Sequence, residues 1–154
     1  MIQVHPPLSG FPLACAVLLC VVEACRLRGK SAARLEWARG FLVVSSLVFT
    51  SAAFLSGYQA SAPLNEVAVP IQDALGRHHA YGRLLLINSI AMMTFFAVGA
   101  RALHGKVLME TLYRLSIVAQ LILALWTGSM GGSLVFDYGL GVTKEGATVR
   151  LTAP

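Results

Sequence analysis

Four long apolar runs divide the sequence, and shorter polar connectors separate them. The runs cover residues 8–25, 40–58, 84–100 and 115–136. A helix needs roughly 20 mostly apolar residues to cross the hydrocarbon core of a membrane, and each run comes close to that length. The remaining residues are too few for a separate soluble domain. The pattern therefore predicts one all-α domain over residues 1–154, an integral membrane bundle of four helices.

The composition strengthens this prediction. Of the 154 residues, 56% are apolar and only 12% are charged, and the mean hydropathy is +0.71. Soluble domains carry about twice that share of charged residues, so lipid is the expected solvent. No basic residue precedes the first run and no small-residue cleavage site follows it. We therefore expect a retained helix there and not a secretion signal.

The basic residues predict the orientation in the membrane. Positive residues close to the ends of spans stay on the cytoplasmic side. Eight of the 12 Lys and Arg lie in or beside the first and third connectors, namely Arg26, Arg28, Lys30, Arg34, Arg39, Arg101, Lys106 and Arg114. Both termini are therefore expected on the outer, periplasmic side. The net charge of +5 marks topology and contact with anionic lipid, and it does not indicate a nucleic-acid partner.

Polar residues inside the runs predict contacts between helices. Asn88, Ser89 and Thr94 in the third run need partners on neighbouring helices, because lipid offers none. Gln120 in the fourth run is expected to bond another helix and not a quinone. The second run is rich in small residues, which let helices approach closely.

Three local patterns add detail. Gly128 and Gly132, four residues apart, predict the close approach of a second helix. Glu23 and Arg26 are three residues apart and are expected to form an ion pair at the inner membrane surface. Residues 69–75 predict a short surface helix that starts at a proline.

Motifs of soluble enzymes are absent from the sequence. It contains no phosphate-binding loop, dinucleotide fingerprint, HExxH, CxxC or nucleophile elbow. We assign no catalytic residue, and an electron-transfer or non-catalytic role is favoured over a stand-alone enzyme.

Histidine placement is the main chemical feature. His5 precedes the first run, and His78 and His79 precede the third, so all three are expected at the outer membrane surface. Two histidines from facing helices are the usual ligands of a b-type haem in a four-helix bundle, because neutral imidazole binds iron and apolar helices bury the porphyrin. This predicts His5 with His79, or with His78, as metal ligands, and Arg77 and Arg83 as partners of the haem propionates. The alternative is that these histidines only form hydrogen bonds at the interface.

The chain resembles the bacterial membrane family catalogued as Domain of Unknown Function 2231. Residues 5–14, HPPLSGFPLA, resemble the opening of that family, and His78 or His79 resembles its histidine at the head of the third span. Residues 127–136, TGSMGGSLVF, with the GLGV at 139–142, resemble its Thr-Gly-His-x-Gly-Gly-x-Leu-Val-Tyr and closing Gly-Val-Gly-Val. Where the family tends to have histidine, this sequence has Gly10, Ser129 and Tyr138.

The resemblance implies a four-helix membrane bundle related to accessory or haem-carrying parts of electron-transfer systems. The leading hypothesis is a small subunit of an electron-transfer or respiratory complex in the bacterial inner membrane, with one b-type haem near the periplasmic face. Its expected partners are other membrane subunits, lipids, and a cytochrome or quinone. The competing hypothesis is a cofactor-free structural or lipid-binding scaffold. A transporter or channel ranks last, because only Glu23 offers a charge within a run.

Overall fold

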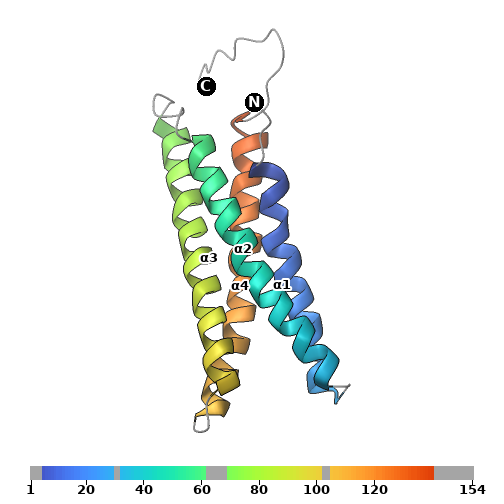
Figure 1. The fold of residues 1–154 in the computed structure, drawn as a ribbon. Coiled ribbons are helices and arrows are strands. Elements are labelled where there is room, and N and C mark those ends of the chain that lie inside the picture. Colours follow the sequence, from blue (N-terminus) through green and yellow to red (C-terminus); the bar gives the residue numbers. More distant parts are fainter. Residues whose placement is uncertain (1–4, 30–31, 62–68, 102–104, 141–154) are drawn as a thin grey trace.

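The computed structural model describes residues 5–29, 32–61, 69–101 and 105–140. These contain four helices in the order α1 (His5–Leu27), α2 (Ala32–Ser61), α3 (Val69–Arg101) and α4 (Lys106–Phe136). The helices run up and down in one bundle, and α1 begins at the same end at which α4 finishes (Figure 1). In the described residues α1 and α3 each contact α2 and α4, so the four helices form a ring of neighbours.

All four helices are long and apolar enough to cross a membrane, which confirms the predicted all-α class and indicates a multi-pass membrane protein. Large apolar side chains such as Val48, Ile87 and Ile122 are exposed on the outside of the bundle. In water these side chains would be unfavourable, whereas lipid tails solvate them. The apolar exterior therefore agrees with the lipid solvent inferred from composition.

The helices are longer than the apolar runs, and α3 shows the largest difference. It has 33 residues, about 50 Å of helix at 1.5 Å per residue. Residues 69–75 are its first turns, so the separate surface helix predicted there is wrong. The proline near the start of α3 is tolerated because the first turn needs no backbone donor. His78 and His79 consequently lie well inside α3 and do not open it.

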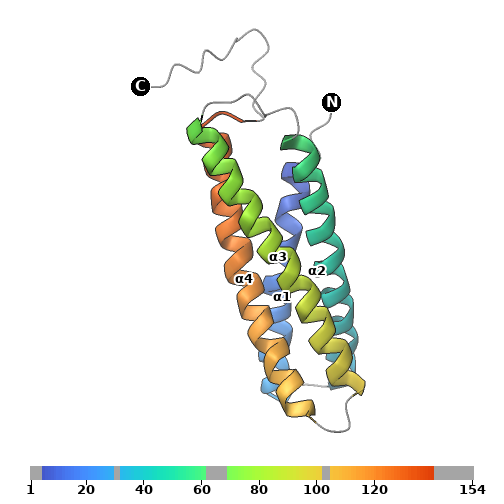
Figure 2. The same cartoon turned by 90° about the vertical axis from the view of Figure 1, so that its left-hand side faces the viewer.

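The two ends of the bundle differ, and we name them by their side chains. The histidine end contains His5 and His78, and the arginine end contains Arg26, Arg39 and Arg114. In Figure 2 the α1–α2 hairpin and the α3–α4 hairpin diverge toward the histidine end. Between the two ends lies an apolar core to which all four helices contribute, made by Leu19, Val43, Met92, Tyr113 and Ile117.

A layer of polar side chains crosses the bundle between this core and the histidine end. Gln120 is completely buried; its Nε2 donates to Ser89 Oγ at 2.7 Å, and its Oε1 accepts from Asn88 Nδ2 at 2.8 Å. Ser89 Oγ also lies 3.2 Å from Thr50 Oγ1. The predicted helix-to-helix bond of Gln120 is thus confirmed. Thr94 differs from expectation, because it is exposed and donates to the Ile90 carbonyl of its own helix.

The arginine end is held by a six-residue ion-pair cluster, the arginine cluster: Glu23, Arg26, Glu36, Arg39, Glu110 and Arg114. The predicted pair of Glu23 and Arg26 is present at 3.1 Å. Arg39 is only 3% exposed; it pairs with carboxylates of α1, α2 and α4 and lies 5.4 Å from the centre of the Phe96 ring of α3. One guanidinium therefore contacts all four helices.

We expect Arg39→Met to lower the free energy of unfolding by about 3 kcal/mol, because it removes a buried cation that pairs with the buried carboxylate of Glu23. The measurement is reversible denaturation of the purified protein in mixed detergent micelles. Arg28→Met is the matched control, since Arg28 is exposed beyond the end of α1 and should change stability by less than about 0.5 kcal/mol. Equal effects of the two substitutions would contradict a structural role for Arg39.

Candidate cofactor pocket

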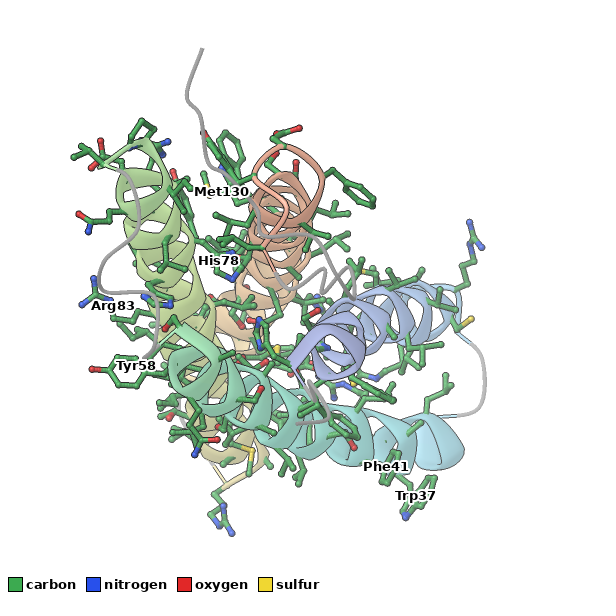
Figure 3. All side chains as sticks on the ribbon, turned by 90° about the horizontal axis from the view of Figure 1, so that it is seen from above. Trp37, Phe41, Tyr58, His78, Arg83 and Met130 are labelled. Atoms are coloured by element: carbon green, nitrogen blue, oxygen red, sulfur yellow. The ribbon has the colours of Figure 1, made fainter. Side chains whose placement is uncertain are left out.

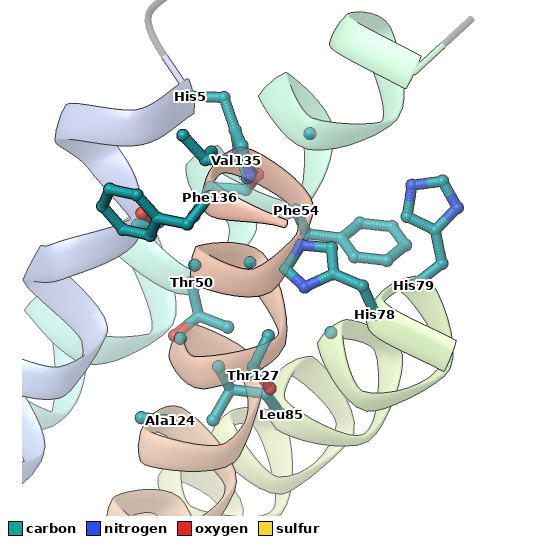
Figure 4. Close-up of a pocket in the computed structure, with 17 residues that line it drawn as sticks. His5, Thr50, Phe54, His78, His79, Leu85, Ala124, Thr127, Val135 and Phe136 are labelled. Carbon is teal, nitrogen blue, oxygen red and sulfur yellow. Dashed lines mark hydrogen bonds between the residues drawn. The ribbon is translucent and has the colours of Figure 1, made fainter. Parts of the chain in front are cut away.

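A cavity of about 320 Å³ lies between the two hairpins at the histidine end. All four helices line it, and Figure 4 shows its side chains. No Asp, Glu, Lys or Arg is among the 17 lining residues. Seven of them are glycine or alanine: Ala53, Gly57, Gly82, Ala124, Gly128, Gly131 and Gly132. Small side chains thus leave room where larger ones would fill the space between the hairpins.

His5, the first residue of α1, is fixed against α2. Its Nδ1 lies 2.9 Å from the Ala53 carbonyl oxygen and 3.2 Å from Ser56 Oγ. A carbonyl oxygen only accepts, so Nδ1 carries the proton and Nε2 keeps a free lone pair. Burial lowers the pKa of His5 below its ordinary value, and the bond to the Ala53 carbonyl opposes part of this effect. His5 is therefore neutral at physiological pH.

His78 of α3 faces His5 across the cavity. The two ring centroids are 6.2 Å apart and the ring planes are nearly perpendicular, at 82°. The His78 ring points toward His5 in Figure 4 and toward the space between the helices in Figure 3, which views the bundle from above. Its Nδ1 is buried and meets no partner in hydrogen-bonding geometry within the described residues, although the backbone of Thr127 makes a looser contact with the ring.

His79 lines the same cavity from its edge. Its ring centroid lies 6.3 Å from that of His78 and 6.1 Å from that of Tyr58, an exposed residue of α2. The structure thus places all three predicted histidines around one cavity, and it brings His78, not His79, into ring contact with His5. The rotation of α3 about its axis decides which of the two histidines faces His5. The spacing of residues in the sequence does not predict this rotation.

Arg77 and Arg83 are exposed and are not among the lining residues. Figure 3 shows Arg83 pointing away from the centre of the bundle. Neither arginine reaches the cavity, so their predicted role beside haem propionates gains no support from their positions. No group of three or more His, Cys, Asp or Glu close enough to share a metal ion occurs in the described residues.

The glycines of α4 differ from expectation. A Cβ atom added to Gly128 would meet nothing within 4 Å, and one added to Gly132 would meet only Phe136 of the same helix. Within the described part of the chain no second helix comes close to this pair, contrary to the prediction, and the pair lines the cavity instead. Contact with another helix occurs at Gly131, where an added Cβ would lie 3.2 Å from His78 Cε1.

Gly57 is a site residue that the sequence did not reveal. A Cβ atom at this position would lie 2.7 Å from Cε1 of the His5 ring, closer than real contacts allow. The residue sits within a run of small residues in α2, so nothing in its local pattern separated it from its neighbours.

Comparisons with protein-family models, with curated proteins and with solved structures find no match.

The lowered pKa of His5 predicts a pH-dependent stability. Because the unfolded state takes up a proton at the ordinary value of 6.5 and the folded state only at lower pH, the contribution of neutral His5 is complete above that value and decreases as pH falls below it. We expect the difference in Tm between wild type and His5→Gln to shrink as pH is lowered from about 8 to about 5. A difference that stays constant or grows over this range would contradict the burial of a neutral imidazole.

Proposed function

We propose that this chain is a small integral subunit of a bacterial electron-transfer or respiratory complex and that His5 and His78 hold one b-type haem at its histidine end. The observation that carries the proposal is the pair of imidazoles facing each other across an uncharged cavity. His5 and His78 would hold the iron between their imidazoles, whose ring centroids lie 6.2 Å apart.

The hydrogen bond of His5 supports a ligand role. Metal-bound histidines almost always donate their second ring nitrogen to a carbonyl or carboxylate, which fixes the ring and makes the bound nitrogen more basic. The bond from His5 Nδ1 to the Ala53 carbonyl has this form and leaves Nε2 for the iron. The low pKa of His5 also keeps the imidazole neutral, as ligation requires.

The cavity walls suit an apolar macrocycle. Phe54, Leu85 and Val135 line the cavity together with its glycines and alanines, and its volume lies at the lower end of the range of about 300–1,000 Å³ found for small-molecule sites. Thr50 lines it as well and joins it to the polar layer below. A bound haem would supply one-electron redox chemistry, while these residues would exclude water from it. We assign no propionate partner.

The charge distribution supports a periplasmic position for this cavity. Six of the eight basic residues that mark the first and third connectors have described side chains. All six lie at that end: Arg26, Arg39 and Arg114 in the arginine cluster, Arg101 and Lys106 in the adjoining turns of α3 and α4, and Arg28 directly after α1. If that end faces the cytoplasm, the histidine end faces the periplasm. Its partners would then be membrane subunits and a redox carrier, a cytochrome or quinone, able to approach from that side.

The proposal is tested by absorption spectroscopy of the protein purified with its native complex. We expect a Soret band and a reduced-minus-oxidised α band attributable to this subunit. His78→Ala should abolish these bands or convert them to those of a five-coordinate haem, because one axial ligand is lost. His79→Ala should leave them nearly unchanged, since His79 borders the same cavity without contacting His5.

Loss of the spectrum in His79→Ala with retention in His78→Ala would assign the ligand to the neighbouring histidine. An intact native complex in which this subunit carries no haem signal would remove the cofactor and favour a structural scaffold. In that case His5→Ala and His78→Ala should also leave electron flow through the complex unaltered.

A further inference from the structure

The two hairpins present their histidines in the same way. In the α1–α2 hairpin, His5 contacts the carbonyl of Ala53 and packs on Gly57. In the α3–α4 hairpin, His78 packs on Gly131, and its ring approaches the backbone of Thr127 without completing a hydrogen bond from Nδ1. The glycine follows the backbone contact by four residues in both cases. Each hairpin therefore supplies one half of the site, and the two halves repeat one arrangement.

The spacing of four residues has a physical reason. A side chain in an α-helix points back toward the helix start and covers the turn before its own Cα. The residue four positions after a carbonyl is therefore well placed to cover that carbonyl with its side chain. Glycine leaves the carbonyl open to a second donor in addition to the helix N–H that it already accepts.

The distances show how closely each ring fits its glycine. A Cβ at Gly57 would lie 2.7 Å from His5 Cε1 and 3.1 Å from its Nδ1. A Cβ at Gly131 would lie 3.2 Å from His78 Cε1 and 3.7 Å from its Nδ1. In each half the absence of a Cβ on the glycine thus leaves free the space that the edge of the imidazole ring fills. The half around His5 is the tighter one, with its hydrogen bond formed at 2.9 Å.

We propose that Gly57 and Gly131 are matched positioning residues, each of which leaves room for one imidazole beside the helix carbonyl one turn earlier, at the edge of the shared cavity. The site is then built for a ligand with two equivalent axial positions, a metal macrocycle between two like imidazoles. This inference concerns the rings themselves, and only its electrochemical consequence rests on the proposed haem. A carbonyl partner makes an imidazole more basic and favours the oxidised metal.

The first test needs no haem. NMR of the imidazole nitrogens in detergent-solubilised protein reports which nitrogen of each histidine carries the proton and whether it is hydrogen-bonded. In the wild type we expect His5 protonated at Nδ1 and bonded. Gly131→Ala should shift the His78 signals and leave those of His5 in place.

Gly128→Ala is the matched control. Gly128 lines the same cavity on the same helix, and an added Cβ meets nothing within 4 Å, so the imidazole signals should stay as in wild type. Protonation of His5 at Nε2 in the wild type, or equal responses to Gly131→Ala and Gly128→Ala, would overturn the inference. Neither outcome depends on whether the chain binds haem.

The second test uses the haem-loaded complex. Gly131→Ala should move the reduction potential to a more positive value and alter the low-spin spectrum, because the His78 ring is displaced from the backbone of Thr127. Gly76→Ala should leave both unchanged, since Gly76 is exposed on α3 outside the cavity lining and an added Cβ meets nothing within 4 Å. An unchanged potential in Gly131→Ala with haem still bound would refute the electrochemical part while leaving the proposed function intact. A wild-type complex without haem would refute the proposed function. The NMR result would then decide whether Gly57 and Gly131 position the two imidazoles.

Discussion

A polar group inside a membrane bundle has to find its partner within the protein, because lipid supplies neither donors nor acceptors. This constraint organises the whole chain. The six charges of the arginine cluster compensate one another, three against three. On the other side of the apolar core, the Gln120 side chain forms hydrogen bonds with Ser89 and Asn88 of α3. The positions of the helices relative to one another follow from these pairings as much as from apolar packing.

The same constraint explains why one end of the bundle is closed and the other contains a cavity. At the arginine end, Arg39 draws α1, α2 and α4 together and packs on Phe96 of α3. At the histidine end no comparable charge network joins the hairpins within the described residues. The contacts of His5 with α2 and of His78 with α4 instead stay inside each hairpin. The space between the hairpins is bordered by rings and glycines, a surface that can receive a ligand.

The sequence predicts most of the fold and only part of the site. Apolar runs identify the four helices because lipid solvation imposes a clear length and composition on each span. The apolar runs begin later than the helices do, since polar residues such as Gln72 and Arg77 belong to α3 but precede its apolar run. The histidines were evident as residue types. The pairing of His5 with His78 could not be predicted, because it depends on the rotation of α3 about its axis. It also depends on glycines whose missing side chains make room for the rings, as at Gly57. The sequence also hid the burial of Arg39, because two of its three carboxylate partners, Glu23 and Glu110, lie on other helices.

The length of α3 sets the depth of the cavity in the membrane. Residues 81–101 of this helix cover about 30 Å, which is the full thickness of a typical hydrocarbon core. If Arg101 lies at one boundary of this core, Tyr81 reaches the other boundary and His78 falls nearly one turn beyond it. An electron held between His5 and His78 would thus be outside most of the transmembrane electric field. Its exchange with a redox partner on that side of the membrane would separate almost no charge across the bilayer and would be nearly insensitive to membrane voltage.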